Sequence, residues 1–166
     1  MGVGGGDAVV SRIGPYGGVW SRASVWPGDG GYIYLPTSTS GFDSGPSSGV
    51  FRVYKYGLDE NGKPSLSFAA TSTESLGGYS SSPIVTSNGT HSGSAMVWLI
   101  RVPDSTGNNA QLLGYEAVPT LGQVTLRFSA PIGRGAKFVP PGVGPARLYV
   151  RTRDGHLLGF GVPAAG

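Results

Sequence analysis

The amino-acid sequence predicts an all-β fold made of repeated antiparallel sheets. The first reason is composition: 30 of the 166 residues are glycine, 13 are proline, and only 13% are charged. Every stretch of about a dozen residues with apolar positions at helical spacing is interrupted by glycine or proline, so we expect almost no helix. The second reason is that the 39% of hydrophobic residues gather in short runs with aromatic and β-branched members, which is typical of strands and not of disorder.

The third reason is a pair of strand-like segments that occurs three times. The first member of the pair lies at 32–35, 96–99 and 147–150, and the second at 51–54, 112–115 and 157–160. Self-similarity at a period of about 45 to 65 residues indicates a repeat fold, in which each unit must stack on its neighbours to bury its faces.

Turn residues divide the first two repeats into four strands each. In the first repeat the strands are expected at 24–27, 31–36, 50–56 and 65–70, with a long loop at 37–49 and a hairpin turn at 59–62. The second repeat gives strands at 82–86, 95–102, 110–118 and 123–129, with a loop at 103–109. Each set therefore predicts a four-stranded antiparallel meander.

The third repeat is one strand short. Its strands are expected at 138–140, 146–152 and 156–161, with Asp154-Gly155 as a two-residue turn. At the other end of the chain, Ala8–Ser11 aligns with Leu126–Ser129, a fourth strand. The sequence thus predicts β-propeller blades at roughly 22–71, 80–130 and 136–161, the last completed by strand 8–13.

Three blades are fewer than the four to eight of an ordinary propeller ring. We expect a segment of a larger ring, with the first strand belonging to a preceding blade. The alternative is a self-assembling unit, in which two copies would give six blades.

The stretch Ala146-Arg-Leu-Tyr-Val-Arg-Thr-Arg-Asp-Gly-His-Leu-Leu-Gly-Phe-Gly161 resembles the blade signature of the quinoprotein-type (pyrroloquinoline-quinone-like) β-propeller repeats. Ser82–Val85 and Phe138–Pro141 resemble the inner strands of that family. From about Gly6 to Pro163 the chain is similar to the C-terminal blades of secreted actinobacterial proteins with such a propeller. The resemblance implies an extracellular bacterial protein, although Met1–Gly6 has no signal-peptide pattern.

The sequence departs from the family where the family carries its chemistry. The positions after the third strands read Lys55–Leu58 and Glu116–Pro119, without the threonine, glycine and tryptophan of the blade-docking motif of the alcohol dehydrogenases. The adjacent cysteines that lie over the quinone are missing, because the chain has no cysteine, and no matching calcium-binding cluster is visible. We therefore expect the family's fold without its cofactor, and no metal.

Candidate ligand-binding residues lie in the long loops. The loops between the second and third strands and the crossings between blades share one end of the sheets, and function usually lies on the end with longer loops. Aromatic rings beside polar side chains there could bind a sugar, although Trp20 and Tyr79 could equally serve packing between blades. The candidates are Tyr16, Trp20, Phe42, Asp43, Tyr79, Asp104, Arg134 and Lys137.

Other chemistry has little support. The net charge is +3, and the cations between Arg127 and Arg153 do not alternate with stacking aromatics, so we expect a solvated rim and no nucleic-acid partner. No apolar run approaches the length of a membrane span. His91 and His156 are the only histidines, and no nucleophile-elbow pattern accompanies them.

The function expected from the sequence is a non-enzymatic scaffold or binding module. Its partner would be a glycan or a protein at the long-loop end, besides neighbouring blades of the same parent or of other copies. The alternative is part of a quinoprotein dehydrogenase or of a polysaccharide-active enzyme, with acids drawn from Asp43, Glu74 and Asp104.

Overall fold

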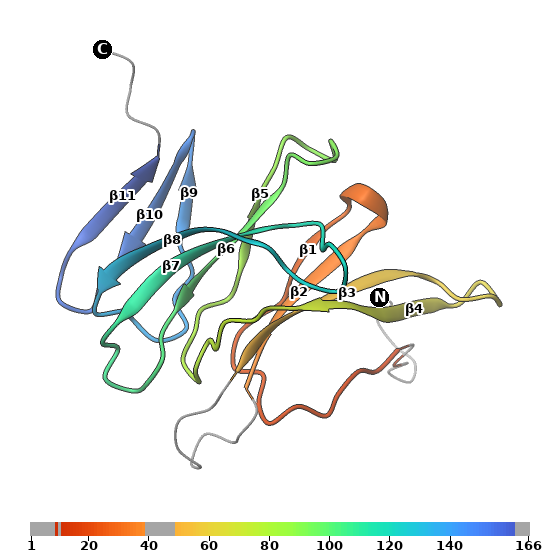
Figure 1. The fold of residues 1–166 in the computed structure, drawn as a ribbon, viewed down its shortest axis with the longest axis horizontal. Coiled ribbons are helices and arrows are strands. Elements are labelled where there is room, and N and C mark those ends of the chain that lie inside the picture. Colours follow the sequence, from red (N-terminus) through yellow and green to blue (C-terminus); the bar gives the residue numbers. More distant parts are fainter. Residues whose placement is uncertain (1–8, 10, 39–48, 162–166) are drawn as a thin grey trace, which may run out of the picture.

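Three antiparallel sheets lie side by side in the computed structural model, which describes residues 9, 11–38 and 49–161 (Figure 1). Sheet 1 contains β1 (Ser24–Trp26), β2 (Tyr32–Thr37), β3 (Val50–Leu58) and β4 (Pro64–Thr71). Sheet 2 contains β5 (Ile84–Thr86), β6 (Met96–Arg101), β7 (Ala110–Glu116) and β8 (Leu126–Gly133). Sheet 3 contains β9 (Gly142–Gly144), β10 (Arg147–Arg151) and β11 (Leu157–Gly161).

The all-β prediction is confirmed, since the one helical element among the described residues is the short 3₁₀ turn η1 (Gly28–Gly30). Each sheet pairs its strands in chain order. No helix in the described part of the chain is both long and apolar enough to cross a bilayer. No closed ring is identified among the described residues, so the propeller itself stays a prediction.

Two expectations for sheet 3 differ from the structure. Its first strand is Gly142–Gly144, not 138–140, because Phe138 has a φ of 63° and lies in a turn. The predicted strand 8–13 is not formed where the structure describes it: residues 9 and 11–13 take no strand conformation, and Val9 is 75% exposed. Residues 8 and 10 lie outside the described residues. β11 therefore pairs with β10 alone within the described ranges.

The sheets bury their faces against each other in sequence order. Side chains of β6 alternate, so Val97 and Leu99 belong to the core shared with sheet 1, while Ile100 and the partly buried Trp98 belong to the core shared with sheet 3. The first core contains the ring of Phe51, whose centroid lies 5.1 Å from that of Tyr115 across the sheets. Stacking of consecutive units is what the repeats predict.

Buried serines attach the crossing between sheets 1 and 2 to the edge of β6. The Ser81 hydroxyl accepts from the Ile100 amide at 2.8 Å. The Ser80 hydroxyl accepts from the Val102 amide at 3.0 Å and donates to the Leu76 carbonyl at 2.5 Å. The crossing thus satisfies backbone groups that the strand pairing leaves open.

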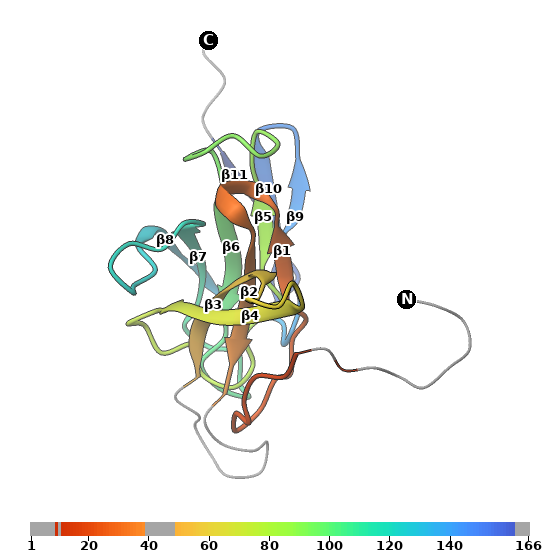
Figure 2. The ribbon, with the colours of Figure 1, turned by 90° about the vertical axis from the view of Figure 1, so that its right-hand side faces the viewer.

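Turns and crossings are divided between two ends of the stack. The β1–β2, β5–β6 and β9–β10 turns lie at the top in Figures 1 and 2, and the crossings lie toward the bottom with the β6–β7 loop. The Gly135 amide donates to the Gly107 carbonyl at 2.8 Å, which joins a crossing to that loop. We call the two the short-turn end and the looped end.

Candidate functional site

A groove of about 1050 Å³ lies between sheets 2 and 3 at the short-turn end. Its walls are mostly apolar, and their principal side chains are Val85, Thr86, Trp98, Phe128, Leu148 and Phe160. None of the six described residues predicted for ligand binding lines it. We call it the aromatic groove.

The internal repeat explains why this groove is open. The strand registers make Trp26 of β1 equivalent to Thr86 of β5, and Tyr32 of β2 equivalent to Met96 of β6. Between sheets 1 and 2, Trp26 and Tyr32 are buried in the core. Thr86 lines the groove, and because its side chain is much smaller than the indole of Trp26, the corresponding wedge between sheets 2 and 3 is left unfilled.

The turn on the opposite wall is also different. Between sheets 1 and 2, the long turn from β5 to β6 reaches over the core, where the Gly89 carbonyl accepts from Trp26 Nε1 at 2.9 Å. In sheet 3, β9 and β10 are joined only by Pro145 and Ala146. The short turn provides no backbone to cover the groove.

Aromatic rings form the inner part of the groove. The Trp98 and Phe128 centroids are 5.7 Å apart at an interplanar angle of 66°, and Phe128 and Phe160 are 6.1 Å apart at 83°. These are edge-to-face contacts. The Trp98 indole N–H donates to the Thr86 hydroxyl at 2.9 Å, so its polar atom is satisfied within the wall.

Of the residues within 9, 11–38 and 49–161, Arg147 is the one charged residue that lines the aromatic groove. It begins β10 beside the short turn and donates through Nη1 to the Ala146 carbonyl at 3.1 Å. The described carboxylates form no ion pair with it. A guanidinium offers five N–H donors, so most of its capacity stays open to a ligand.

At the looped end, Tyr79 and Lys137 lie together. The Lys137 ammonium lies 4.7 Å from the centroid of the Tyr79 ring, and this ring is tilted against that of Phe138 at 6.1 Å. The Phe138 amide donates to the Tyr79 carbonyl at 3.1 Å. These contacts join two consecutive crossings, which is the packing role considered for Tyr79.

Asp104 and Arg134 converge on one turn. The Asp104 carboxylate accepts from the amide of Thr106 at 2.8 Å and from its hydroxyl at 2.5 Å, and these bonds lower the pKa of Asp104. Arg134 donates to the Thr106 carbonyl at 3.3 Å. Arg153, which the sequence did not single out as a site residue, donates to the same carbonyl at 3.1 Å. Both guanidinium groups thus bind the backbone of this turn.

Tyr16 and Trp20 lie beside sheet 1. The Tyr16 hydroxyl is hydrogen-bonded to the Tyr54 hydroxyl, and Arg52 lies 4.8 Å from the centroid of the Tyr16 ring. Burial, together with the Tyr16 hydroxyl, raises the pKa of Tyr54 to about 12. Trp20 is 46% exposed at the edge of a small hollow that Ser38 and others line.

Phe42 and Asp43 lie outside the described residues. The structure therefore brings Tyr79 to Lys137, and both Asp104 and Arg134 to the turn at Thr106, while Tyr16 contacts Tyr54 and Trp20 borders a separate hollow.

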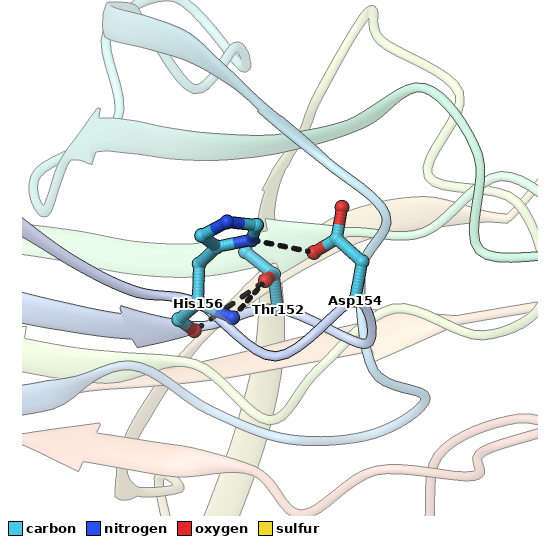
Figure 3. A network of polar contacts seen from close by, with 3 residues as sticks. All are labelled: Thr152, Asp154 and His156. Atoms are coloured by element: carbon cyan, nitrogen blue, oxygen red, sulfur yellow. Dashed lines mark hydrogen bonds and ion pairs between the residues drawn. The ribbon is translucent and has the colours of Figure 1, made fainter.

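An aspartate and a histidine meet in the turn between β10 and β11 (Figure 3). Asp154 Oδ1 lies 3.3 Å from His156 Nδ1. The Thr152 hydroxyl accepts from the His156 amide at 3.0 Å, so it bonds to backbone and not to the ring. The Thr152 hydroxyl and then the His156 imidazole lower the pKa of Asp154. The arrangement shapes a turn and lacks the nucleophile–base contact of a triad.

Comparisons with family models, with curated proteins and with solved structures find no match for this chain. Among the described residues, no three histidine, aspartate or glutamate side chains lie close enough to hold a metal ion.

Proposed function

We propose that this chain is a non-catalytic binding module of propeller-type blades, whose ligand binds in the aromatic groove between sheets 2 and 3. The supporting observation is the groove itself, about 1050 Å³ in volume and walled by Trp98, Phe128 and Phe160. Ligand sites are typically concave and apolar, with few polar groups. General acid–base catalysis needs a group that exchanges protons near neutral pH, and Arg147, the charged residue of the lining, stays protonated.

A neutral hydrophobic dye, Nile red, tests the site. We expect its fluorescence to rise on binding the protein. In a Thr86→Trp variant, the new indole would occupy the wedge as Trp26 does between sheets 1 and 2, so the dye signal should fall to the background.

Thr120→Trp is the matched control, because Thr120 is an exposed turn residue outside the groove lining. This variant should bind the dye like the parent. Equal dye binding by both tryptophan variants, with both folded by circular dichroism, would refute the site.

The propeller, the quinoprotein-type resemblance and the extracellular location belong to the same proposal. Three sheets of consecutive strands, packed in chain order, support blades of a larger ring. The enzymatic alternative predicts a thermal shift and dye-linked oxidation of alcohols or sugars when quinone and calcium are added. We expect neither.

Self-assembly is a second candidate, favoured by exposed apolar side chains on the outer faces of sheets 1 and 3. Val25 and Phe68 are exposed on the outer face of sheet 1, and Tyr149 and Leu157 on that of sheet 3. The face of one copy could stack on the other face of the next, as the sheets do within the chain. A monodisperse monomer in sedimentation would contradict this candidate, and a dimer would support it.

Binding of a glycan or a protein at the looped end is the remaining hypothesis, and the exposed ring of Trp20 supports it. A Trp20→Ala variant should then lose retention on a polysaccharide matrix while staying folded. Unchanged retention would remove Trp20 from the hypothesis.

A further inference from the structure

We infer that the ligand of the aromatic groove is a small anionic molecule that carries an aromatic ring. The ring would take the place that Trp26 takes between sheets 1 and 2, and the acid would meet Arg147. This inference rests on the proposed function, since it names the class of ligand for the same groove.

The aromatic ring of the ligand is inferred from the packing of Trp26 in the preceding repeat. Trp26 fills its wedge with an indole that is 3% exposed and donates an N–H to the Gly89 carbonyl at 2.9 Å. At the equivalent position, Thr86 removes the whole ring system. The wedge between sheets 2 and 3 therefore lacks what the same geometry accommodates one repeat earlier.

The surrounding side chains suit a planar ring more than an aliphatic one. Trp98, Phe128 and Phe160 already form a series of edge-to-face contacts. A further ring placed against this series would gain the same edge and face contacts, which contribute beyond the buried area alone.

The negative charge of the ligand is inferred from the residues that line the aromatic groove. Arg147 is its charged member, and no aspartate or glutamate that the structure describes lines the groove. The Nη1 bond to the Ala146 carbonyl holds the guanidinium at the short turn. Hydrogen bonds between a guanidinium and a carboxylate are charge-assisted and about twice as strong as neutral ones. A cation of the same shape would be repelled.

Four probes of similar size separate the two requirements: indole-3-acetate, indole, cyclohexylacetate and tryptamine. Tryptophan fluorescence or calorimetry gives the dissociation constant of each. Indole-3-acetate should bind about tenfold more tightly than indole, because it adds a charge-assisted bond. The dissociation constant of cyclohexylacetate should be at least about threefold higher than that of indole-3-acetate, because cyclohexylacetate lacks the aromatic ring contacts. Tryptamine should bind most weakly.

Arg147→Gln isolates the charge. This substitution should raise the dissociation constant of indole-3-acetate by about tenfold and leave that of indole unchanged. Arg151→Gln is the control, since Arg151 ends the same strand and does not line the groove. Equal losses in both variants would refute the role of Arg147.

The two proposals can fail separately. If Nile red binds and Thr86→Trp abolishes its binding, but the four probes bind equally or not at all, the ligand class is wrong and the site stands. If neither the dye nor any probe binds in a way that Thr86→Trp abolishes, both are wrong.

Discussion

Packing between sheets 1 and 2 depends on Phe51, which offers the sharpest test of the stacked architecture. Its ring is fully buried, with the Tyr34 centroid at 6.1 Å on its own sheet and the Tyr115 centroid at 5.1 Å on the next. Truncation to alanine should cost about 3–5 kcal/mol, a large part of the stability of a domain. Phe51→Leu, which keeps the site filled, should cost about 1–2 kcal/mol.

Urea unfolding followed by tryptophan fluorescence measures these costs, provided that the slope with denaturant is unchanged. A double-mutant cycle of Phe51→Leu with Tyr115→Leu should show a coupling of about 0.5–1.5 kcal/mol. Phe68→Leu, at an exposed ring of sheet 1, should change stability by less than about 0.5 kcal/mol. Additivity of the Phe51 and Tyr115 variants within about 0.3 kcal/mol would refute contact between the two rings.

Two further variants test local features. Gly114→Ala should destabilise the protein by about 1–3 kcal/mol, because the added Cβ would lie 2.5 Å from the Trp98 ring. In the control Gly57→Ala the added Cβ meets no atom within 4 Å, so this variant should be close to neutral. Equal unfolding midpoints for both variants would contradict the packing of Trp98. Thr152→Val should raise the pKa of Asp154 toward the ordinary value of 3.8, measured by NMR titration of the carboxyl group. Because the folded-state pKa of Asp154 is lowered, the contribution of this carboxylate to stability is complete above about pH 4 and is lost as the pH falls through that pKa. An unchanged titration of Asp154 in the variant would exclude the Thr152 hydroxyl as the cause.

Most strands could be predicted from the sequence because their apolar runs are long and end at glycine or proline. The segment 31–36 is predicted within one residue of β2, and 156–161 within one residue of β11. The first strand of sheet 3 was missed because Gly142–Gly144 contains only one side chain with strand preference, while Phe138–Pro140 looks more like a strand. The start of the chain shows that apolar alternation over a few residues does not ensure pairing.

The looped end was predicted correctly as a place where crossings and loops meet, but the grouping of its side chains was not. Lys137 covers Tyr79 because two crossings pack together, a contact that sequence order does not reveal. The aromatic groove was missed because function was expected only in long loops. A signal for it exists in the repeat itself, since aligning 24–26 with 84–86 places Trp26 opposite Thr86.

Each sheet is made of strands that follow one another directly along the chain. This order affects when each part of the protein can fold during its synthesis. Once residues up to 133 have left the ribosome, both partners of the first core are complete. The nascent chain could therefore fold sheets 1 and 2 before sheet 3 is translated. Until then Ile100 and Leu112 would stay uncovered, so a pause at this stage would expose a surface that chaperones recognise.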